Sequence, residues 1–284
     1  MKNKFVFFIP PFTEQSAGIV CCHHMADEMA KMGEEVFVVP FEVGFKTQDR
    51  KFSYKTASKD EVFRMEGAVA VYPEVIHDNP LEIRNVARLI LNRDGLLSGK
   101  KVGRNNGEFI VSFSKVYEYG DFLIHDIIFP LEIFNLEGAL PNEERKLTLL
   151  YAGKNGEFIG KVEPPAMFLT RTFGKQDEVA WLLKRAKILY SADPMCFLNH
   201  EALLCGCAPV ITDFSGYWKL EELLRHEIPM VYEMNRDKDF GEDRIRIERE
   251  KLIQKLNEFK TEFPDRLTQL VRSMNQHFSN RVSA

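Results

Sequence analysis

Short apolar runs that alternate with helix-like segments constrain the fold of this chain more than any other feature. A strand, a helix and a second strand in this order join parallel neighbours, so the alternation predicts an α/β fold. Helices should cover both faces of its parallel sheets. We expect strands at residues 5–10, 35–40, 68–73, 108–113, 121–130, 147–152, 166–170, 188–190, 208–212 and 229–232.

Helix start and stop signals accompany these runs. Asn79 has the features of an N-cap, because Pro80 occupies the first helical position and Glu82 completes a capping box, so we expect a helix to about residue 92. Other helices should span 16–32, begin at a cap formed by Asp177, and end at Gly206. Two more are expected at 243–259 and 263–279, with Pro264 between them. Their apolar stripe consists of Leu252, Leu256, Phe259, Leu267, Leu270 and Met274.

The length of 284 residues allows two domains of roughly 140 residues each. Residues 136–146 are polar and contain Gly and Pro between two apolar runs, which is typical of a linker. The alternating pattern restarts after this segment. We therefore predict two Rossmann-like domains, the first formed by 1–140 together with a C-terminal helix at about 262–280, the second by 141–260.

Charge and cysteine content exclude several classes of protein. The net charge of −4 and a pI near 6.0, with basic residues interleaved among acids, argue against a nucleic-acid partner. No apolar run reaches the roughly 20 residues that cross a bilayer, and the N-terminus has no cleavage-site pattern. Five cysteines in apolar stretches suit reduced thiols. The expected location is cytoplasmic.

Three patterns that suggest other chemistry are weak. Cys21, Cys22, His23 and His24 are consecutive on one helix and cannot converge on one ion. Residues 95–101, GLLSGKK, lack the spacing and the Ser or Thr of a P-loop. The acids of the 237–239 triplet lie in a charge run typical of a solvated turn. We expect no metal site and no resident cofactor.

Residues 189–212 form the most informative passage, since a strand, a polar turn, a helix, a glycine stop and a second strand follow each other closely. Ligands of open parallel sheets bind beyond the carboxyl ends of strands, where helix N-termini offer unpaired amides. Asp193 lies in the turn and Glu201 one to two turns into the helix, so acids could accept hydrogen bonds from sugar hydroxyls while amides hold a diphosphate. These amides would come from Met195, Cys196, Phe197 and Leu198.

The sequence EALLCGCAPVI in this passage resembles the donor-site signature of GT-B glycosyltransferases, in which two acids separated by seven residues precede a small-residue helix, Gly and Pro-Val. Asp193 and Glu201 have this spacing, although the first acid is more commonly Glu and a usual Phe-Gly pair is replaced by Met195 and Cys196. The resemblance implies that Glu201 binds ribose hydroxyls and that Asp193 approaches the donor sugar. The alternative is a helix-capping Asp193 and an exposed Glu201.

LLYAGKNG at 149–156 resembles the strand, glycine and basic residue that open the donor domain of these enzymes. Gly153 would let backbone approach phosphate, and Lys154 would neutralise charge on the leaving group. A second basic residue often assists in this family, and Arg171 or Lys161 could serve.

Two passages of the N-terminal half extend the resemblance. Residues 72–95 are similar to a stretch of bacterial polysaccharide glycosyltransferases, which implies that Glu74, His77 and Asn79 contact an acceptor or a sugar hydroxyl. Residues 10–18 resemble the first loop of the family, where Gly18 would permit close approach of a ligand. An inverting enzyme would also need a general base, for which His77, Glu74 and His125 are candidates.

The resemblance as a whole implies glycosyl transfer from a nucleotide-sugar donor to a hydroxyl of a glycan or small-molecule acceptor, in surface polysaccharide biosynthesis. It implies a GT-B architecture in which the C-terminal helix crosses back to the first domain. It also implies catalysis without a metal and peripheral membrane contact through a lipid-linked acceptor. A sugar-nucleotide epimerase or hydrolase, or a non-catalytic sugar-nucleotide-binding subunit, remains an alternative.

Overall fold

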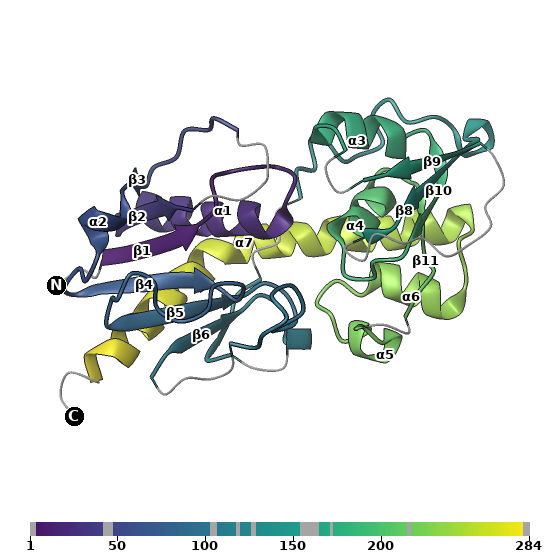
Figure 1. The fold of residues 1–284 in the computed structure, drawn as a ribbon. Coiled ribbons are helices and arrows are strands. Elements are labelled where there is room, and N and C mark those ends of the chain that lie inside the picture. The colour runs from purple at the N-terminus through teal and green to yellow at the C-terminus, as the bar shows by residue number, and fades with distance from the viewer. Residues whose placement is uncertain are drawn as a thin grey trace. The chain divides into compact units, whose positions relative to one another are not determined.

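The computed structural model describes residues 4–41, 48–102, 107–117, 120–125, 129–153, 165–170, 173–214 and 217–280. The chain divides into two compact units, Met1–Ile127 with Phe259–Ala284, and Ile128–Glu258 (Figure 1). Each unit contains one sheet, and every strand pair in both sheets is parallel. The α/β class and the parallel sheets predicted from the sequence are confirmed.

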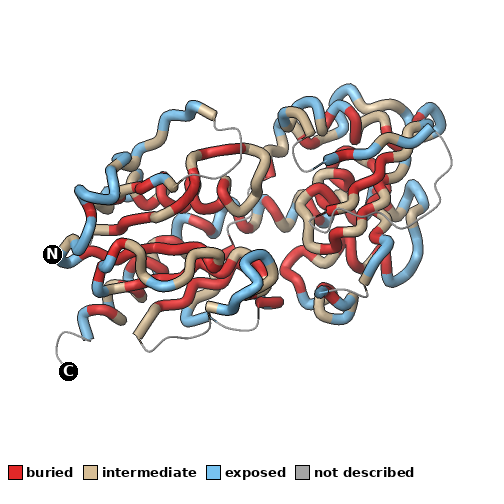
Figure 2. Tube along the Cα trace, viewed as in Figure 1, coloured by how far each residue is buried: buried red, intermediate tan, exposed pale blue. Residues whose placement is uncertain are grey.

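The first unit contains a seven-stranded sheet in the order β3-β2-β1-β4-β5-β6-β7. Strand β4 is buried along its whole length and β5 along all but its first residue, as Figure 2 shows in red. The strands are β1 (Lys4–Ile9), β2 (Glu35–Pro40), β3 (Lys55–Thr56), β4 (Ala68–Pro73), β5 (Asn85–Ile90), β6 (Phe109–Ser112) and β7 (Phe122–Leu123), and the helical elements are α1 (Ala17–Lys31), α2 (Lys59–Val62) and the 3₁₀ turn η1 (Lys115–Tyr117).

The second unit contains a four-stranded sheet in the order β11-β10-β8-β9. Its strands are β8 (Leu147–Tyr151), β9 (Ala166–Leu169), β10 (Ala186–Ser191) and β11 (Ala208–Ile211). Its helical elements are η2 (Asn142–Glu144), α3 (Gln176–Leu183), α4 (Phe197–Leu204), α5 (Leu220–Leu223) and α6 (Met230–Asp237). The last helix, α7 (Glu242–Asn280), belongs to the second unit up to Glu258 and to the first from Phe259.

The helix expected at 79–92 is wrong, because this stretch forms a loop and strand β5. Asn79 caps no helix. Its side-chain oxygen accepts a hydrogen bond from the Tyr72 hydroxyl at 2.7 Å, and its amide donates to the Ile83 carbonyl at 2.8 Å. Asp78 and Glu82 have φ values of 59° and 51°, in the left-handed region that interrupts a right-handed helix.

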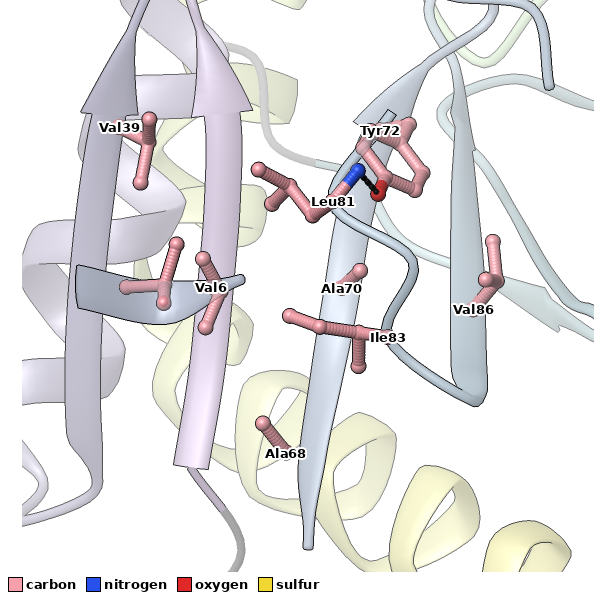
Figure 3. Close-up of a cluster of buried hydrophobic side chains, with 9 residues drawn as sticks. Val6, Val39, Ala68, Ala70, Tyr72, Leu81, Ile83 and Val86 are labelled. Atoms are coloured by element: carbon pink, nitrogen blue, oxygen red, sulfur yellow. Dashed lines mark hydrogen bonds between the residues drawn. The ribbon is translucent and has the colours of Figure 1, made fainter. Parts of the chain in front are cut away.

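This loop buries its own apolar residues against the sheet. Leu81 and Ile83 are 0% and 1% exposed, and the Leu81 amide donates to the Tyr72 hydroxyl at 3.1 Å. Figure 3 shows Val6, Val39, Ala68, Ala70, Tyr72, Leu81, Ile83 and Val86 gathered on one face of the sheet. A loop and the short helix α2 therefore cover this face, where the sequence predicts a long helix.

Four further expectations about helices and strands are wrong. Residues 229–232 begin helix α6 and form no strand, because a short apolar run does not distinguish a buried helix from a strand. Among the described residues of the run 121–130, the strand is limited to β7, and Asp177 lies in the first turn of α3, after the capping position. Helix α7 continues through Pro264 as one helix of 39 residues, whose predicted apolar stripe is buried as expected.

The segment expected to be a linker, 136–146, is anchored within the second unit. Arg145 is 5% exposed and donates to the carbonyls of Leu140 at 2.8 Å and Cys205 at 3.1 Å. The division between the compact units lies instead at residues 127 and 128. The functional domain limits expected from the sequence stay a prediction.

Candidate functional site

The order of strands in the second sheet creates a switch point between β8 and β10. The chain passes from β8 outward to β9 and then returns to β10 on the other side of β8. Open parallel sheets bind ligands at such points, where the order of the strands reverses. Gly153 follows β8 and Asp193 follows β10.

Gly153 and Asp193 lie against each other at this point. Tyr151 and Ser191 are partners at the ends of their strands, and the Ala192 amide donates to the Tyr151 carbonyl at 2.8 Å. Gly153 has a φ of 70°, and a Cβ atom added to it would lie 2.3 Å from the Asp193 Cβ. Both the left-handed backbone and the close approach require glycine here.

Asp193 holds its own turn with one carboxylate oxygen. Its Oδ1 accepts from the Met195 amide at 3.2 Å, and its carbonyl accepts from the buried Asn199 side chain at 2.9 Å. Its Oδ2 is buried and has no hydrogen-bond partner within the described ranges. Since a buried carboxylate oxygen is costly to leave unpaired, it suits a ligand that donates a hydrogen bond.

Helix α4 begins directly after this turn with an uncapped N-terminus. Cys196 occupies the N-cap position and its side chain makes no capping hydrogen bond. The Met195 amide is engaged by Asp193, whereas the amides of Phe197 and Leu198 have no acceptor among the residues that the structure describes. Two of the predicted amide donors therefore remain open to an anion.

Two arginines neutralise the opposite end of α4. Arg145 donates to the Cys205 carbonyl at 3.1 Å, and Arg249 donates to the Leu204 carbonyl at 2.7 Å. Positive groups at a helix C-terminus complement the macrodipole and fix the orientation of the helix. Sequence reasoning missed both arginines, because they lie 60 and 45 positions away from the carbonyls that they bind.

Glu201 lies in the second turn of α4 and is half-buried. Burial raises the pKa of Glu201 to about 8. The carboxyl group is consequently largely protonated at neutral pH in the absence of a ligand. A titratable group with a strongly perturbed pKa at a switch point is typical of functional sites.

A buried ring cluster underlies the turn that precedes α4. His200 is 3% exposed and packs near the rings of Phe129, His226 and Tyr232, with centroid distances of 5.9, 6.3 and 5.9 Å. Burial, with the nearby His226, lowers the pKa of His200 to about 3, so the ring is neutral at physiological pH. The Tyr232 hydroxyl donates to the Met195 sulfur at 3.5 Å, which connects the cluster to the turn.

The first sheet has its own switch point between β1 and β4, and buried polar residues follow its strands. Glu74, directly after β4, is 3% exposed and its Oε2 accepts from the Leu91 amide at 3.1 Å. His125 is buried and stacks on Phe259 with centroids 5.0 Å apart. These side chains belong to the group Thr13, Glu74, Asn92, Asp94, Ser114 and His125, all less than 9% exposed.

The structure describes some of the remaining predicted site residues and leaves others outside the described ranges. His77 is half-buried and its Nε2 atom has no hydrogen-bond partner within the described part of the chain. Gly18 lies in α1, where an added Cβ would meet Leu91 at an ordinary 3.7 Å, so no steric constraint requires glycine there. Lys154, Lys161 and Arg171 lie outside the described residues. The roles assigned to all of them stay predictions.

The residues that the structure describes contain no group of three or more His, Cys, Asp or Glu side chains that could hold a metal ion. Within the same ranges, no helix has both the length and the apolar character that crossing a membrane requires. Asp237, which the sequence offered as a weak metal ligand, pairs with Arg236 at 2.8 Å and with Arg244 at 3.1 Å.

No protein-family model matches the sequence, and no curated protein matches it. Among solved structures, an alpha-glucosyltransferase in complex with UDP and a DNA containing a HMU base matches 94% of this chain and 100% of its own, with 12% identity and a TM-score of 0.51. A structure of the Wall Teichoic Acid Polymerase TagF covers 99% of this chain and 90% of its own, with 10% identity and a TM-score of 0.42. At these identities, the first likeness shows a shared fold and nothing finer.

Proposed function

We propose that this chain is a glycosyltransferase that moves a sugar from a nucleotide-activated donor to an acceptor hydroxyl. One observation carries the proposal: the open N-terminus of α4 and the unpaired Oδ2 of Asp193 meet at the switch point of the second sheet. The fold shared with a glucosyltransferase over nearly the whole chain adds support. The proposal includes a GT-B architecture, with the second unit as donor domain and the C-terminal helix returning to the first.

The α4 end would bind the nucleotide part of the donor. The open amides of Phe197 and Leu198 suit the diphosphate, because they present N–H groups at the positive end of a helix. The Glu201 carboxylate would accept hydrogen bonds from both ribose hydroxyls. Lys154 and Arg171 would neutralise charge on the departing diphosphate, so that the reaction proceeds without a metal.

Asp193 would contact the sugar that is transferred. Its Oδ2 lacks a partner in the described protein and accepts a hydrogen bond from a sugar hydroxyl in this proposal. For an inverting reaction, a base from the first unit is needed to remove the acceptor proton, and Glu74, His77 and His125 are the candidates. We further propose a cytoplasmic role in surface polysaccharide biosynthesis, with a glycan, a small molecule or a lipid-linked glycan as acceptor and no nucleic-acid partner.

Calorimetry with nucleoside diphosphates tests the two acidic roles separately. Glu201→Ala should weaken binding by about tenfold to a hundredfold, since a carboxylate that accepts two hydrogen bonds contributes on the order of 1.5 to 3 kcal/mol. Asp193→Ala should bind the free nucleotide nearly as well as the parent but transfer sugar more slowly, because its contact is with the moving group. If both variants bind and react like the parent, the donor site lies elsewhere.

Turnover assays distinguish this function from its alternatives. The protein would be incubated with UDP-, GDP-, ADP- and CDP-linked donors, with and without a panel of glycan acceptors, and the products identified by mass spectrometry. Acceptor-dependent consumption of a donor supports glycosyl transfer. Consumption without an acceptor indicates an epimerase or hydrolase, and binding without any consumption indicates a non-catalytic sugar-nucleotide-binding subunit.

A further inference from the structure

In the first unit, hydrogen bonds connect the loop after β1 with residues 48–54, which follow β2. The Gln48 amide donates to the Phe12 carbonyl at 2.9 Å, and the Glu14 amide donates to the Gln48 side chain at 3.0 Å. His23 on α1 connects the same two stretches, because its ring nitrogens bond the Pro10 carbonyl at 2.8 Å and the Tyr54 hydroxyl at 2.6 Å. These contacts fix residues 48–54 beside the end of a central strand.

Arg50 is exposed within residues 48–54 and lies over two aromatic rings. Its guanidinium carbon is 5.2 Å from the centroid of Phe12 and 5.6 Å from that of Phe52. The Phe52 ring in turn stacks on Tyr54, with centroids 4.8 Å apart and an interplanar angle of 16°. Aromatic support limits the rotamers of the arginine and leaves the N–H groups at its edge available for hydrogen bonds.

The acids near Arg50 are engaged by other residues. Asp27 accepts from the Ser53 amide at 2.5 Å and pairs with Lys31 at 2.8 Å. Glu14 accepts from the Gln48 side chain at 3.4 Å. Among the residues that the structure describes, none gives Arg50 a carboxylate partner.

Other arginines of this unit that lie over aromatic rings differ in this respect. Arg64 lies over Phe63 and pairs with Glu82, while Arg88 lies over Tyr72 and pairs with Glu108 at 2.9 Å. Arg50 has the same aromatic support without the acid. Its guanidinium, supported by two rings, thus has the geometry of an anion-binding group whose anion is supplied from outside.

The position of Arg50 agrees with a ligand role. The Phe12 loop follows β1, which borders the switch point of the first sheet, and leads into α1. Ser16 occupies the N-cap position of this 15-residue helix without a side-chain capping bond. A helix N-terminus and an arginine both favour negative charge.

We propose that Arg50, on its Phe12 and Phe52 support, binds an oxyanion, a phosphate or a carboxylate, on the acceptor substrate. The assignment of this anion to an acceptor substrate rests on the proposed function, whereas the anion site itself does not depend on it. The proposed substrate class is an acceptor with a negatively charged group, either on a soluble glycan or in a lipid headgroup.

Titration of ¹⁵N-labelled protein tests the site directly. Inorganic phosphate and glucuronate should shift amide signals of the 12–16 and 48–54 stretches in the parent. Arg50→Gln should weaken this binding at least tenfold, and Phe52→Leu should weaken it less. Arg64→Gln is the matched control, since it removes a ring-supported arginine of the same unit that already has an acid partner, and it should bind like the parent.

Sedimentation with vesicles identifies the source of the anion. If the protein sediments with phosphatidylglycerol vesicles but not with phosphatidylcholine vesicles, and Arg50→Gln abolishes this binding, the anion belongs to a lipid headgroup. If the protein binds the soluble probes but neither kind of vesicle, the acceptor is soluble. Unchanged phosphate and glucuronate binding in Arg50→Gln, with its melting temperature equal to that of the parent, would overturn the inference. Nucleotide binding to the same variant should be normal, so failure of the donor site is distinguishable from failure of this one.

Discussion

Replacing Glu201 by glutamine should make the second unit more stable, and the gain should grow with pH. Burial raises the pKa of Glu201 from 4.5 to about 8 in the folded protein. A group whose folded-state pKa lies above its unfolded value costs nothing below the unfolded pKa and destabilises the fold as pH rises toward the folded pKa. The penalty therefore develops between about pH 4.5 and pH 8.

The size of the effect follows from the same two pKa values. Each pH unit in this interval contributes ~1.4 kcal/mol, which gives about 3 to 5 kcal/mol by pH 8 as an order of magnitude. Glutamine keeps the shape of the side chain and removes its titration. The free energy of unfolding of Glu201→Gln minus that of the parent should thus be small at pH 5 and several kcal/mol at pH 8.5.

Urea unfolding followed by tryptophan fluorescence measures this difference. The chain has two tryptophans, and both Trp181 and Trp218 lie in the second unit, so the signal reports on the unit that contains Glu201. Glu250→Gln is a suitable control for the glutamate-to-glutamine change itself, because this side chain is 62% exposed and lies in the same unit. A Glu201→Gln difference that is equal at pH 5 and pH 8.5 would refute the argument from burial.

Three further predictions concern the same unit. Gly153→Ala should destabilise it by about 1 to 3 kcal/mol in urea unfolding, because the new methyl group collides with Asp193 and the backbone has a positive φ. Below about pH 6.5 the parent should lose stability faster than His200→Gln on acid titration, because burial lowers the pKa of His200 to about 3 and only the unfolded ring binds a proton there. Nucleoside diphosphates should raise the melting temperature equally with magnesium and with a chelator, since the proposed diphosphate contacts are amides and basic side chains.

The sequence predicted correctly those parts of the fold that depend on the pattern of neighbouring residues. Apolar runs such as 35–40 and 68–73 became strands at nearly the expected limits, and the signature around 189–212 gave the correct strand, helix and strand. Gly153 and Asp193 were expected at one site, and the structure places them in contact. Both follow neighbouring parallel strands, so their proximity is a consequence of sheet order alone.

The errors occurred where a distant residue decides the conformation. Residues 79–92 contain strong helix-start signals, yet the Tyr72 hydroxyl engages both Asn79 and the Leu81 amide and holds the segment as a loop. In the α6 segment, the buried Asn235 bonds the backbone of strand β11 through both its side-chain oxygen and its side-chain nitrogen, which holds this helix against the second sheet. Neither constraint can be read from the spacing of residues along the segment itself.

The candidate site shows the same division between local and distant determinants. Its acids and amides lie within one β10–α4 unit and were found from the sequence. The groups that set their properties, Arg145, Arg249 and the rings around His200, come from separate segments.

The arrangement around α4 also has a physical consequence for the proposed chemistry. Arginines occupy the carbonyl end of the helix, and the N-terminal amides of Phe197 and Leu198 have no acceptor among the described residues. The acids within residues 186–204 are Asp193 and Glu201, and burial raises the pKa of Glu201 to about 8. If Glu201 were charged without a ligand, it would oppose an incoming diphosphate at the same helix end. A neutral carboxyl removes that repulsion, and ribose hydroxyls that bind the ionised form would then release a proton, so nucleotide affinity should rise with pH up to about 8. The open helix end and the raised pKa thus belong to one electrostatic arrangement, in which nucleotide binding at the helix end is coupled to the ionisation of Glu201.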